Sequence, residues 1–163
     1  MKKNLLQCST IILVAALAIT GANAQDTLYK KLPTITVYSS TKVSNEVSKA
    51  FRSTFPDAEK AVWYKASENY LVRFMTNDQT NRALFEKNGM LVYHILYGNE
   101  SNLPDNIHKM VKSNYSGYDI TMVIYVSQDE RNVWVINVEN SQKLIILRSE
   151  DGELEKVNTY NKM

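Results

Sequence analysis

The sequence predicts an α+β fold of tandem α-β-β-β-β units, in which two helices pack on one face of a curved antiparallel sheet. Helical spacing of apolar residues gives way to period-two alternation in the first half of the chain, and the same order of patterns returns in the second half. A Gly followed two residues later by a Leu also occurs twice, in FEKNGMLVYHILYG (85–98) and in RSEDGELEKVNTYN (148–161).

The first 24 residues have the composition of a secretion signal. Lys2 and Lys3 form a basic start, an apolar run extends over 11–19, and ANA at 22–24 is a cleavage sequence of the A-x-A kind. The apolar run is shorter than the roughly 20 residues that a membrane-spanning helix needs. We therefore expect cleavage after Ala24, a periplasmic or secreted location, and no stable membrane insertion of the mature protein.

Cleavage at this site removes the basic excess of the chain. There are 19 Lys and Arg against 17 Asp and Glu, so the loss of Lys2 and Lys3 leaves 17 of each and a formal net charge of zero. A nucleic-acid-binding protein is expected to carry a basic stripe, so the balance predicts no nucleic-acid partner. The one Cys, Cys8, precedes the apolar run, which argues against a lipid-anchored cysteine. Without disulfides, the mature protein is expected to depend on its core for stability.

The first half of the mature chain predicts a leader, a helix and about four strands. Residues 25–42 are polar and rich in Ser and Thr, and we expect an N-terminal leader with one short edge strand at TITVY. Apolar residues at steps of three and four predict a helix from Val43 to Phe55. Period-two alternation then predicts antiparallel strands, the last at MLVYHILY. Asn88-Gly89 supplies the positive φ angles of a tight hairpin turn.

The second half repeats this order. SNLPDNIHKMVKSNYSGYD, at 101–119, predicts a short helix that ends before Gly117. Its apolar face matches the first helix at an offset of 60 residues, and the strand patterns match at an offset of 63, with Gly89 on Gly152. A three-residue insertion between helix and sheet accounts for the change. Chance matching of apolar positions is the alternative, but the agreement of the turn residues favours an internal repeat.

The ordered motifs FPDAEKAVWY, YLVRF, ALFEKNGML and LPDNIHKMVKSNYSGYDI resemble the beta-lactamase-inhibitor-like, PepSY-like domains of exported bacterial proteins. The resemblance extends from about Val43 to Tyr160. It implies a double PepSY-like domain over 43–163, with units at about 43–98 and 103–160, and a secreted or periplasmic location. It also implies that the protein binds or inhibits other exported proteins, peptidases among them, although a fold alone does not determine function.

The second unit departs from the first at two core positions under this alignment. Asn137 takes the place of Phe74, and Arg148 takes the place of Phe85. We therefore do not expect the cores of the two units to be fully equivalent.

The sequence carries no pattern that predicts catalysis or a metal site. His94 falls in a predicted strand and His108 on the second helix, without the His-x-x-x-His or Glu-x-x-His spacing of a metal site. Acidic pairs such as Asp129-Glu130 fall in predicted turns, which argues against a carboxylate pair of the glycosidase type. The five Gly form no phosphate-binding loop. We therefore expect no enzyme activity, no catalytic residue, no metal and no cofactor.

Ten Tyr and two Trp make aromatic side chains abundant. Such residues bury a large area and keep a polar end, and they are frequent at protein interfaces. With Trp63, Val72 and Phe74 facing the helices, alternation places a candidate partner-binding set on the opposite face: Tyr64, Arg73, His94, Tyr125 and Trp134. Core packing or scattered exposure is the alternative for each aromatic, and one bulge would exchange the faces.

Two functions of different classes follow from these observations. The first is an exported, non-catalytic protein-binding or inhibitor module that presents a sheet face to an envelope or secreted protein. The second is a periplasmic carrier of a small apolar ligand held between helices and sheet. A carrier should be stabilised by a small molecule in a thermal shift screen, whereas a binding module should capture a protein from the cell envelope.

Overall fold

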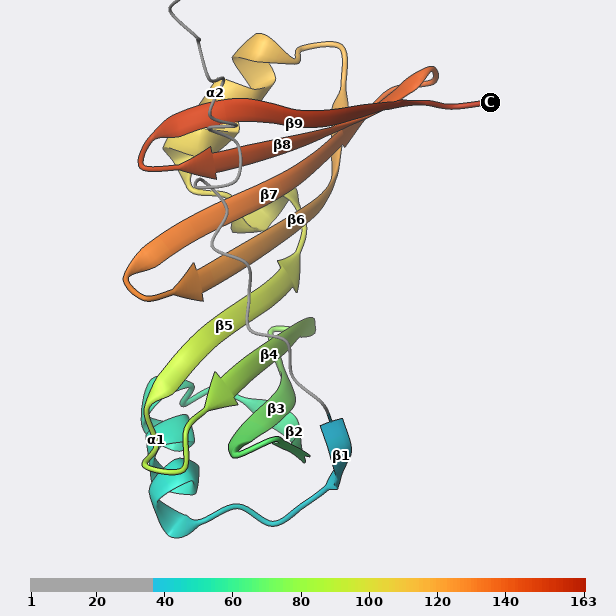
Figure 1. The fold of residues 1–163 in the computed structure, drawn as a ribbon. Coiled ribbons are helices and arrows are strands. Elements are labelled where there is room, and N and C mark those ends of the chain that lie inside the picture. Colours follow the sequence, from blue (N-terminus) through green and yellow to red (C-terminus); the bar gives the residue numbers. More distant parts are fainter. Residues whose placement is uncertain (1–36) are drawn as a thin grey trace, which may run out of the picture. The chain divides into compact units, whose positions relative to one another are not determined.

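Nine strands form one antiparallel sheet in the computed structural model, which describes residues 37–163 (Figure 1). Each strand pairs with its neighbour in the sequence, so the order runs from β1 to β9 without a crossover. The predicted signal peptide, at 1–24, and all but the end of the predicted leader, at 25–42, lie outside the described residues. A short edge strand, β1, is present at Val37–Ser40 and overlaps the end of the predicted one.

A helix followed by four strands occurs twice, as the sequence predicts. The first series comprises α1 (Asn45–Thr54), β2 (Glu59–Ala66), β3 (Asn69–Thr76), β4 (Gln79–Phe85) and β5 (Leu91–Gly98). A short 3-10 helix, η1 (Glu100–Asn102), leads into the second series: α2 (Asp105–Asn114), β6 (Asp119–Gln128), β7 (Arg131–Glu139), β8 (Lys143–Glu150) and β9 (Glu153–Asn161). The α+β fold class is therefore confirmed.

The two helices are equivalent at the predicted offset of 60 residues. In α1 the buried side chains are Val47 and Phe51, one turn apart, and in α2 they are Ile107 and Val111. The side chain of Ser44 accepts a hydrogen bond from the Val47 amide at 3.3 Å and so satisfies one of the unpaired donors at the start of α1. Each helix therefore turns one narrow apolar stripe toward the sheet.

The helices also end in the same way. The Phe55 amide donates to the Phe51 carbonyl, and the Tyr115 amide donates to the Val111 carbonyl, both at 2.8 Å. Three residues further on, the Ala58 amide donates to the Phe55 carbonyl, and the Tyr118 amide donates to the Tyr115 carbonyl. Both strands β2 and β6 begin directly after this turn.

Both helices pack on the same side of the sheet, which we call the helix face. Directly paired residues share a face, so a row of pairs follows one side across the sheet. One such row runs from the core under α1 to the core under α2: Phe74, Asn81, Leu96, Tyr125, Trp134, Ser149 and Leu154. The prediction that two helices occupy one face is confirmed, and Figure 1 shows α1 beside β2 to β5 and α2 beside β6 to β9.

The helix face carries two separate cores. The core under α1 is aromatic, and its buried members are Val47, Phe51, Val72, Phe74, Ala83 and Phe85. The core under α2 is aliphatic, and its buried members are Leu103, Ile107, Val111, Ile120, Val123, Ile136, Val138, Ile145 and Leu147. The expected difference between the two cores is present, although it arises at other positions than the sequence comparison suggested.

The strand offset of 63 is wrong by one residue in the middle of the sheet. Trp63 and Val72 are cross-strand partners in the first core, and Val123 and Ile136 are the equivalent partners in the second. The first two are four residues closer together in the sequence than the second two. The extra residues therefore lie in the β6–β7 hairpin, and not between helix and sheet. Because side chains alternate between faces, a slip of one residue exchanges the two sides of a strand.

At the corrected offset of 64, the partners of the two aromatic core residues change. Val138 corresponds to Phe74, and Ser149 corresponds to Phe85, because these residues lie on the helix face and hold equivalent pairings in the two units. Asn137 and Arg148, which an offset of 63 aligns with Phe74 and Phe85, point to the opposite side of the sheet.

The two Gly-x-Leu turns differ in geometry. Asp151 and Gly152 both have positive φ, at 50° and 82°, and close the two-residue turn that the sequence predicts. At the other site Gly89 has φ 89°, but Asn88 is not in the positive-φ region, and five residues separate the paired Phe85 and Leu91. The tight hairpin predicted at Asn88-Gly89 is therefore a longer loop.

Candidate functional site

The face of the sheet opposite the helix face is covered by neither α1 nor α2. A row of directly paired residues marks it across six strands: Val62, Arg73, Arg82, Ile95, Val126 and Val133. On the first half of this face, five side chains form what we call the arginine face: Tyr64, Leu71, Arg73, Arg82 and Tyr97. Charged and aromatic groups therefore share a surface that the helices leave open.

The two arginines of the arginine face stand directly opposite each other on neighbouring strands. Arg73 of β3 is the cross-strand partner of Arg82 of β4, and both side chains are exposed. The two-residue turn at Asn77 and Asp78, both with positive φ, sets this register. Within residues 37–163 neither guanidinium forms an ion pair. Two like charges are thus held side by side, an arrangement that destabilises a sheet.

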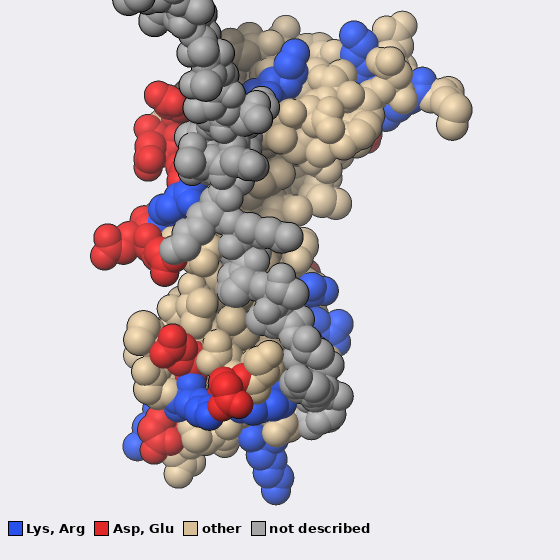
Figure 2. Space-filling view, in the orientation of Figure 1, with Lys and Arg blue, Asp and Glu red and all other residues tan. Residues whose placement is uncertain are grey.

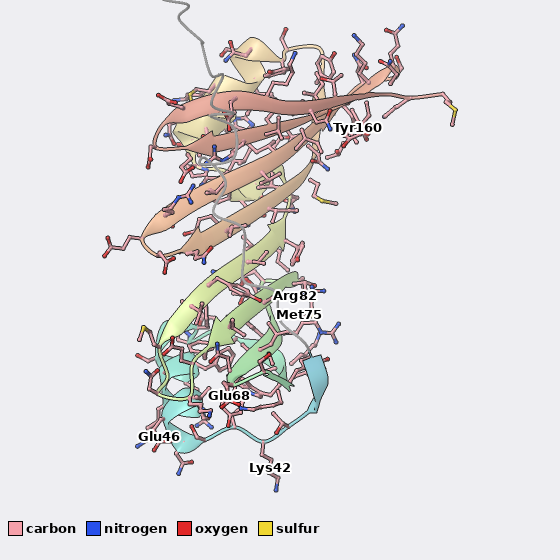
Figure 3. All side chains as sticks on the ribbon, viewed as in Figure 1. Lys42, Glu46, Glu68, Met75, Arg82 and Tyr160 are labelled. Carbon is pink, nitrogen blue, oxygen red and sulfur yellow. The ribbon has the colours of Figure 1, made fainter. Side chains whose placement is uncertain are left out.

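Two tyrosines, Tyr93 and Tyr97, interact with the charge of Arg82. The guanidinium carbon of Arg82 lies 5.5 Å from the ring centroid of Tyr97, within range of a cation–π interaction. Burial raises the pKa of the Tyr93 hydroxyl, and the positive charge of Arg82 opposes this shift. In Figure 3 Arg82 lies near Met75, which belongs to the neighbouring strand.

Two hollows adjoin Arg73. One, of about 310 Å³, is lined by Tyr64, Leu71 and both arginines. The other, of about 210 Å³, has Lys60 and Val62 in its lining together with Arg73. The arginine face therefore offers cationic groups at the border of two shallow, partly apolar depressions.

The second half of the same sheet face also carries arginines, and these are neutralised within the chain. Arg148 is buried and forms ion pairs with Glu150 and with Glu155, the latter at 2.7 Å between Nη1 and Oε1. Arg131 donates to both carboxylate oxygens of Glu150, at 2.7 and 3.0 Å. Figure 2 shows acidic groups gathered on the side of the molecule where the β6–β7 and β8–β9 turns lie.

The five residues predicted to bind a partner are divided between the two faces. Tyr64 and Arg73 lie on the arginine face, as expected. His94, Tyr125 and Trp134 lie on the helix face, so their predicted placement is wrong.

The reasons for the misplacement are local irregularities of the strands. Phe85 pairs with Leu91 but Leu84 pairs with Tyr93, which leaves Val92 as the extra residue of a β-bulge and reverses the alternation before His94. In β7 the longer β6–β7 hairpin shifts the register by one residue, and Trp134 packs against the core under α2. Sequence alternation cannot reveal either irregularity.

The three misplaced residues form an aromatic cluster between the two cores. The ring centroid of Tyr125 lies 4.7 Å from that of Trp134 and 6.0 Å from that of His94. His94 in turn lies 4.8 Å from Phe55, the residue that closes α1. This cluster joins the two halves of the helix face through side-chain packing.

His94 is held neutral in this environment. Burial lowers its pKa to about 4. The Asn81 amide nitrogen donates to the Gln79 carbonyl at 3.0 Å, so its carbonyl oxygen faces His94 Nε2 at 2.9 Å as an acceptor. His94 therefore carries its proton on Nε2 and uses it in a structural hydrogen bond.

Neither a metal cluster nor a membrane-spanning helix is found in the part of the chain that the structure describes. No group of three His, Cys, Asp or Glu residues is arranged there to hold a metal ion. No helix in that part is long and apolar enough to cross a bilayer.

Arg82 is the residue of the candidate site that the sequence interpretation missed. The signal was present, because a two-residue turn at 77–78 pairs position 73 with position 82. Leu71 and Tyr97 also belong to the arginine face by simple alternation along β3 and β5 beyond the bulge. A register drawn from this turn would have found Leu71 and Arg82, whereas the placement of Tyr97 also depends on the bulge at Val92.

Comparisons with known proteins place the fold among solved structures from Bacteroides. No protein-family model and no curated protein matches this chain. A BLIP-like protein from Bacteroides fragilis shares 18% identity at a TM-score of 0.55, over 84% of this chain and 91% of that chain. A DUF2874 family protein from Bacteroides ovatus shares 20% identity at a TM-score of 0.54, over 74% and 89%. A DUF2874 family protein from Bacteroides uniformis shares 17% at 0.53, over 74% and 90%.

At these identities the likeness shows a common fold. The chain thus has the fold of a BLIP-like protein and of DUF2874 family proteins. The beta-lactamase-inhibitor-like part of the expected resemblance is matched at the level of the fold, and the PepSY-like part stays a prediction.

Proposed function

We propose that this protein is an exported, non-catalytic module that binds a protein partner through the arginine face. The observation that carries the proposal is the exposed pair of Arg73 and Arg82, set among Tyr64, Leu71 and Tyr97 on a sheet face that neither helix covers.

The composition of the arginine face suits protein recognition. Interfaces take most of their binding energy from a few Trp, Tyr and Arg side chains, each of which typically contributes about 2 kcal/mol or more on truncation. Tyr64, Arg73 and Arg82 surround one hollow, so a single inserted side chain of a partner could contact all three. A nine-stranded sheet fixes the backbone from which these side chains project, which lowers the entropy cost of binding.

Export is supported by the N-terminal sequence and by one comparison. Residues 1–24 have the basic start, apolar run and small-residue cleavage sequence of a secretion signal. A Bacteroides eggerthii protein whose name proposes a periplasmic location shares 17% identity at a TM-score of 0.53, over 74% of this chain and 90% of that chain. Inhibition of an exported enzyme is one form that the proposed binding can take.

The observed packing favours a binding module over a carrier of apolar ligands. Aromatic rings fill the space between α1 and the sheet: Phe51 lies 5.1 Å from Phe74, and Phe55 lies 4.7 Å from the same ring. Trp63 adds an edge contact to Phe51 at 5.2 Å. The region in which a carrier would hold its ligand is therefore occupied by side chains of the core.

The proposal is tested by capture from the cell that exports the protein. The chain without residues 1–24 is immobilised and incubated with envelope and extracellular extracts, and retained proteins are quantified by mass spectrometry. We expect Tyr64→Ala to lose a protein that the parent and Met90→Ala both retain, because Met90 is exposed in the β4–β5 loop and outside the arginine face. Equal retention by all three forms would contradict the proposal, as would stabilisation by a small apolar molecule without any captured protein.

A further inference from the structure

We infer that Arg73 and Arg82 recognise an acidic segment of the partner, in which Asp or Glu carboxylates meet both guanidinium groups. This inference rests on the proposed function, because it names the chemistry of the partner that the arginine face accepts.

The arginine pair lacks counter-charge in its own surroundings. The paired and diagonal positions around it on the same face are apolar or uncharged: Val62, Leu71, Met75, Thr80, Leu84, Ile95 and Tyr97. Lys60, in the lining of the hollow next to Arg73, is a further positive group and not a counter-charge. Glu59 stands opposite Met75 at the start of β2 but forms no ion pair with either arginine. Two adjacent, exposed guanidinium groups therefore have no carboxylate partner among residues 37–163.

The N-terminal segment of the chain does not supply this anion in quantity. Residues 25–36 contain one acid, Asp26, against Lys30 and Lys31, so the segment is basic overall. Charge complementarity thus favours a second molecule as the occupant.

In the second half of the same sheet face, arginine side chains pair with glutamate carboxylates. Arg148 of β8 stands directly opposite Glu155 of β9, and their side chains form an ion pair. Arg131 meets Glu150 with a two-pronged contact, the geometry in which guanidinium and carboxylate groups match best. In the second half of the sheet β8 and β9 provide the carboxylates, and in the first half the inferred acidic segment of the partner provides them.

The surroundings favour an acidic peptide over a lipid surface or a nucleic acid. Binding to anionic membranes or to nucleic acids relies on a broad basic surface. Here the two arginines are confined between Tyr64, Leu71 and Tyr97, and the other half of the face is neutralised by its own acids. Apolar and aromatic neighbours next to paired arginines fit a protein segment in which acidic and apolar side chains alternate.

A defined probe tests the inference in solution. The probe is a capped hexapeptide that alternates threonine and glutamate, and its match has glutamine in place of glutamate. Binding to the chain without residues 1–24 is followed by amide chemical shifts and by calorimetry at 20 mM and 300 mM NaCl. We expect the glutamate peptide to shift amides of β3 and β4, with at least tenfold weaker binding at high salt, since exposed charges are screened.

Variants assign the binding to the arginine pair. Arg73→Gln and Arg82→Gln should each weaken binding of the glutamate peptide at least fivefold, and the glutamine peptide should bind to none of the forms. Arg52→Gln is the matched control, because Arg52 is an exposed arginine on α1, away from the sheet face. Equal binding by the two sheet variants and the parent would overturn the inference, and so would absence of binding to the parent.

Two further measurements, vesicle binding and capture by the double variant, distinguish the remaining outcomes. Binding of the parent to phosphatidylglycerol vesicles, dependent on Arg73 and stronger than binding to the peptide, would overturn the acidic peptide in favour of a lipid surface. If the variant with both arginines changed to glutamine still captures the same envelope protein as the parent, the inference fails while the proposed function stands. If Tyr64→Ala and this double variant both lose that protein, and the peptide results agree, the inference is supported.

Discussion

Arg73 and Arg82 are direct cross-strand partners with two exposed guanidinium groups and no carboxylate partner within residues 37–163. Like charges placed directly opposite each other in a sheet are destabilising, by roughly 0.2 to 1 kcal/mol. A sheet that served only its own stability would place an opposite charge or an uncharged residue at one of the two positions. The pair is therefore a local cost to stability, of the kind that proteins tend to keep at functional sites.

Removing one charge of this pair should stabilise the protein. We expect Arg73→Gln to raise the free energy of unfolding by about 0.5 kcal/mol at low salt, because repulsion from Arg82 is lost. The gain should shrink in 0.5 M NaCl as screening increases. Denaturant unfolding at both salt concentrations measures it, with Arg52→Gln as the control that should show no gain. A loss of stability for Arg73→Gln at low salt would show that the two charges do not repel each other appreciably.

Acid should destabilise the fold through His94. Its folded-state pKa is about 4, below the ordinary value of 6.5, because burial disfavours the charged ring. The unfolded chain therefore takes up a proton before the folded chain does, and stability present above pH 6.5 is lost as the pH falls toward 4. We expect a loss on the order of 1 to 3 kcal/mol across this window.

The pH range in which His94 takes up its proton also separates its effect from that of Glu100. The hydrogen bonds from His108 and Lys112 lower the pKa of Glu100, so its contribution is lost only below the ordinary range of a carboxyl group. Unfolding midpoints between pH 5 and 7 thus lie above the range in which the contribution of Glu100 is lost. His94→Gln should flatten the dependence there, and an unchanged slope in this variant would assign the effect to another group.

Trp134 should behave as a core residue. It lies on the helix face, packs against the core under α2, and contacts Tyr125 at 4.7 Å between ring centroids. We expect Trp134→Ala to lower the free energy of unfolding by about 2 kcal/mol or more, since truncation of a large packed aromatic leaves a cavity. Tyr64→Ala, on the arginine face, should cost less stability while it abolishes partner capture. A stable Trp134→Ala protein that no longer captures its partner would return Trp134 to the binding surface.

The two turn glycines should differ in their tolerance of a methyl group. A Cβ at Gly89 would lie 3.1 Å from the Ala50 Cβ and 3.3 Å from the Glu46 carbonyl oxygen, whereas a Cβ at Gly152 meets no atom within 4 Å. Both have positive φ, so either alanine substitution strains the backbone at a cost on the order of 1 kcal/mol. We expect Gly89→Ala to cost at least 1 kcal/mol more than Gly152→Ala, because it also pushes α1 away from its loop. Equal denaturant midpoints for the two variants would contradict this account of the loop.

The order of elements could be predicted from the sequence because it depends on local periodicity. The stripes of Val47 and Phe51 and of Ile107 and Val111 identify both helices, and alternation identifies the strands that follow. The placement of side chains on faces was less predictable, because it requires every register between the first strand and the last. The bulge at Val92 reverses the alternation and carries no distinctive sequence signal.

The candidate site was predicted in the part of the sheet where the register is regular. Tyr64 and Arg73 lie on strands joined by short turns, and both are where alternation places them. Tyr125 precedes the turn of the longer β6–β7 hairpin and Trp134 follows it, and their placement failed because one strand offset was applied to both strands. The internal repeat itself stays a prediction, supported by the equivalent helix ends at Phe55 and Tyr115.

The central claim is that the partner binds to the sheet face opposite the helices, and site-specific photo-crosslinking in the exporting cell tests it most directly. A benzoylphenylalanine is introduced at Leu71, in the hollow of the arginine face, or at Lys49, an exposed position on α1. The account predicts one discrete crosslinked protein from position 71, lost when Arg82 is also changed to glutamine, and no such product from position 49. The same protein crosslinked from position 49 and not from position 71 would show that the helices, and not the arginine face, meet the partner.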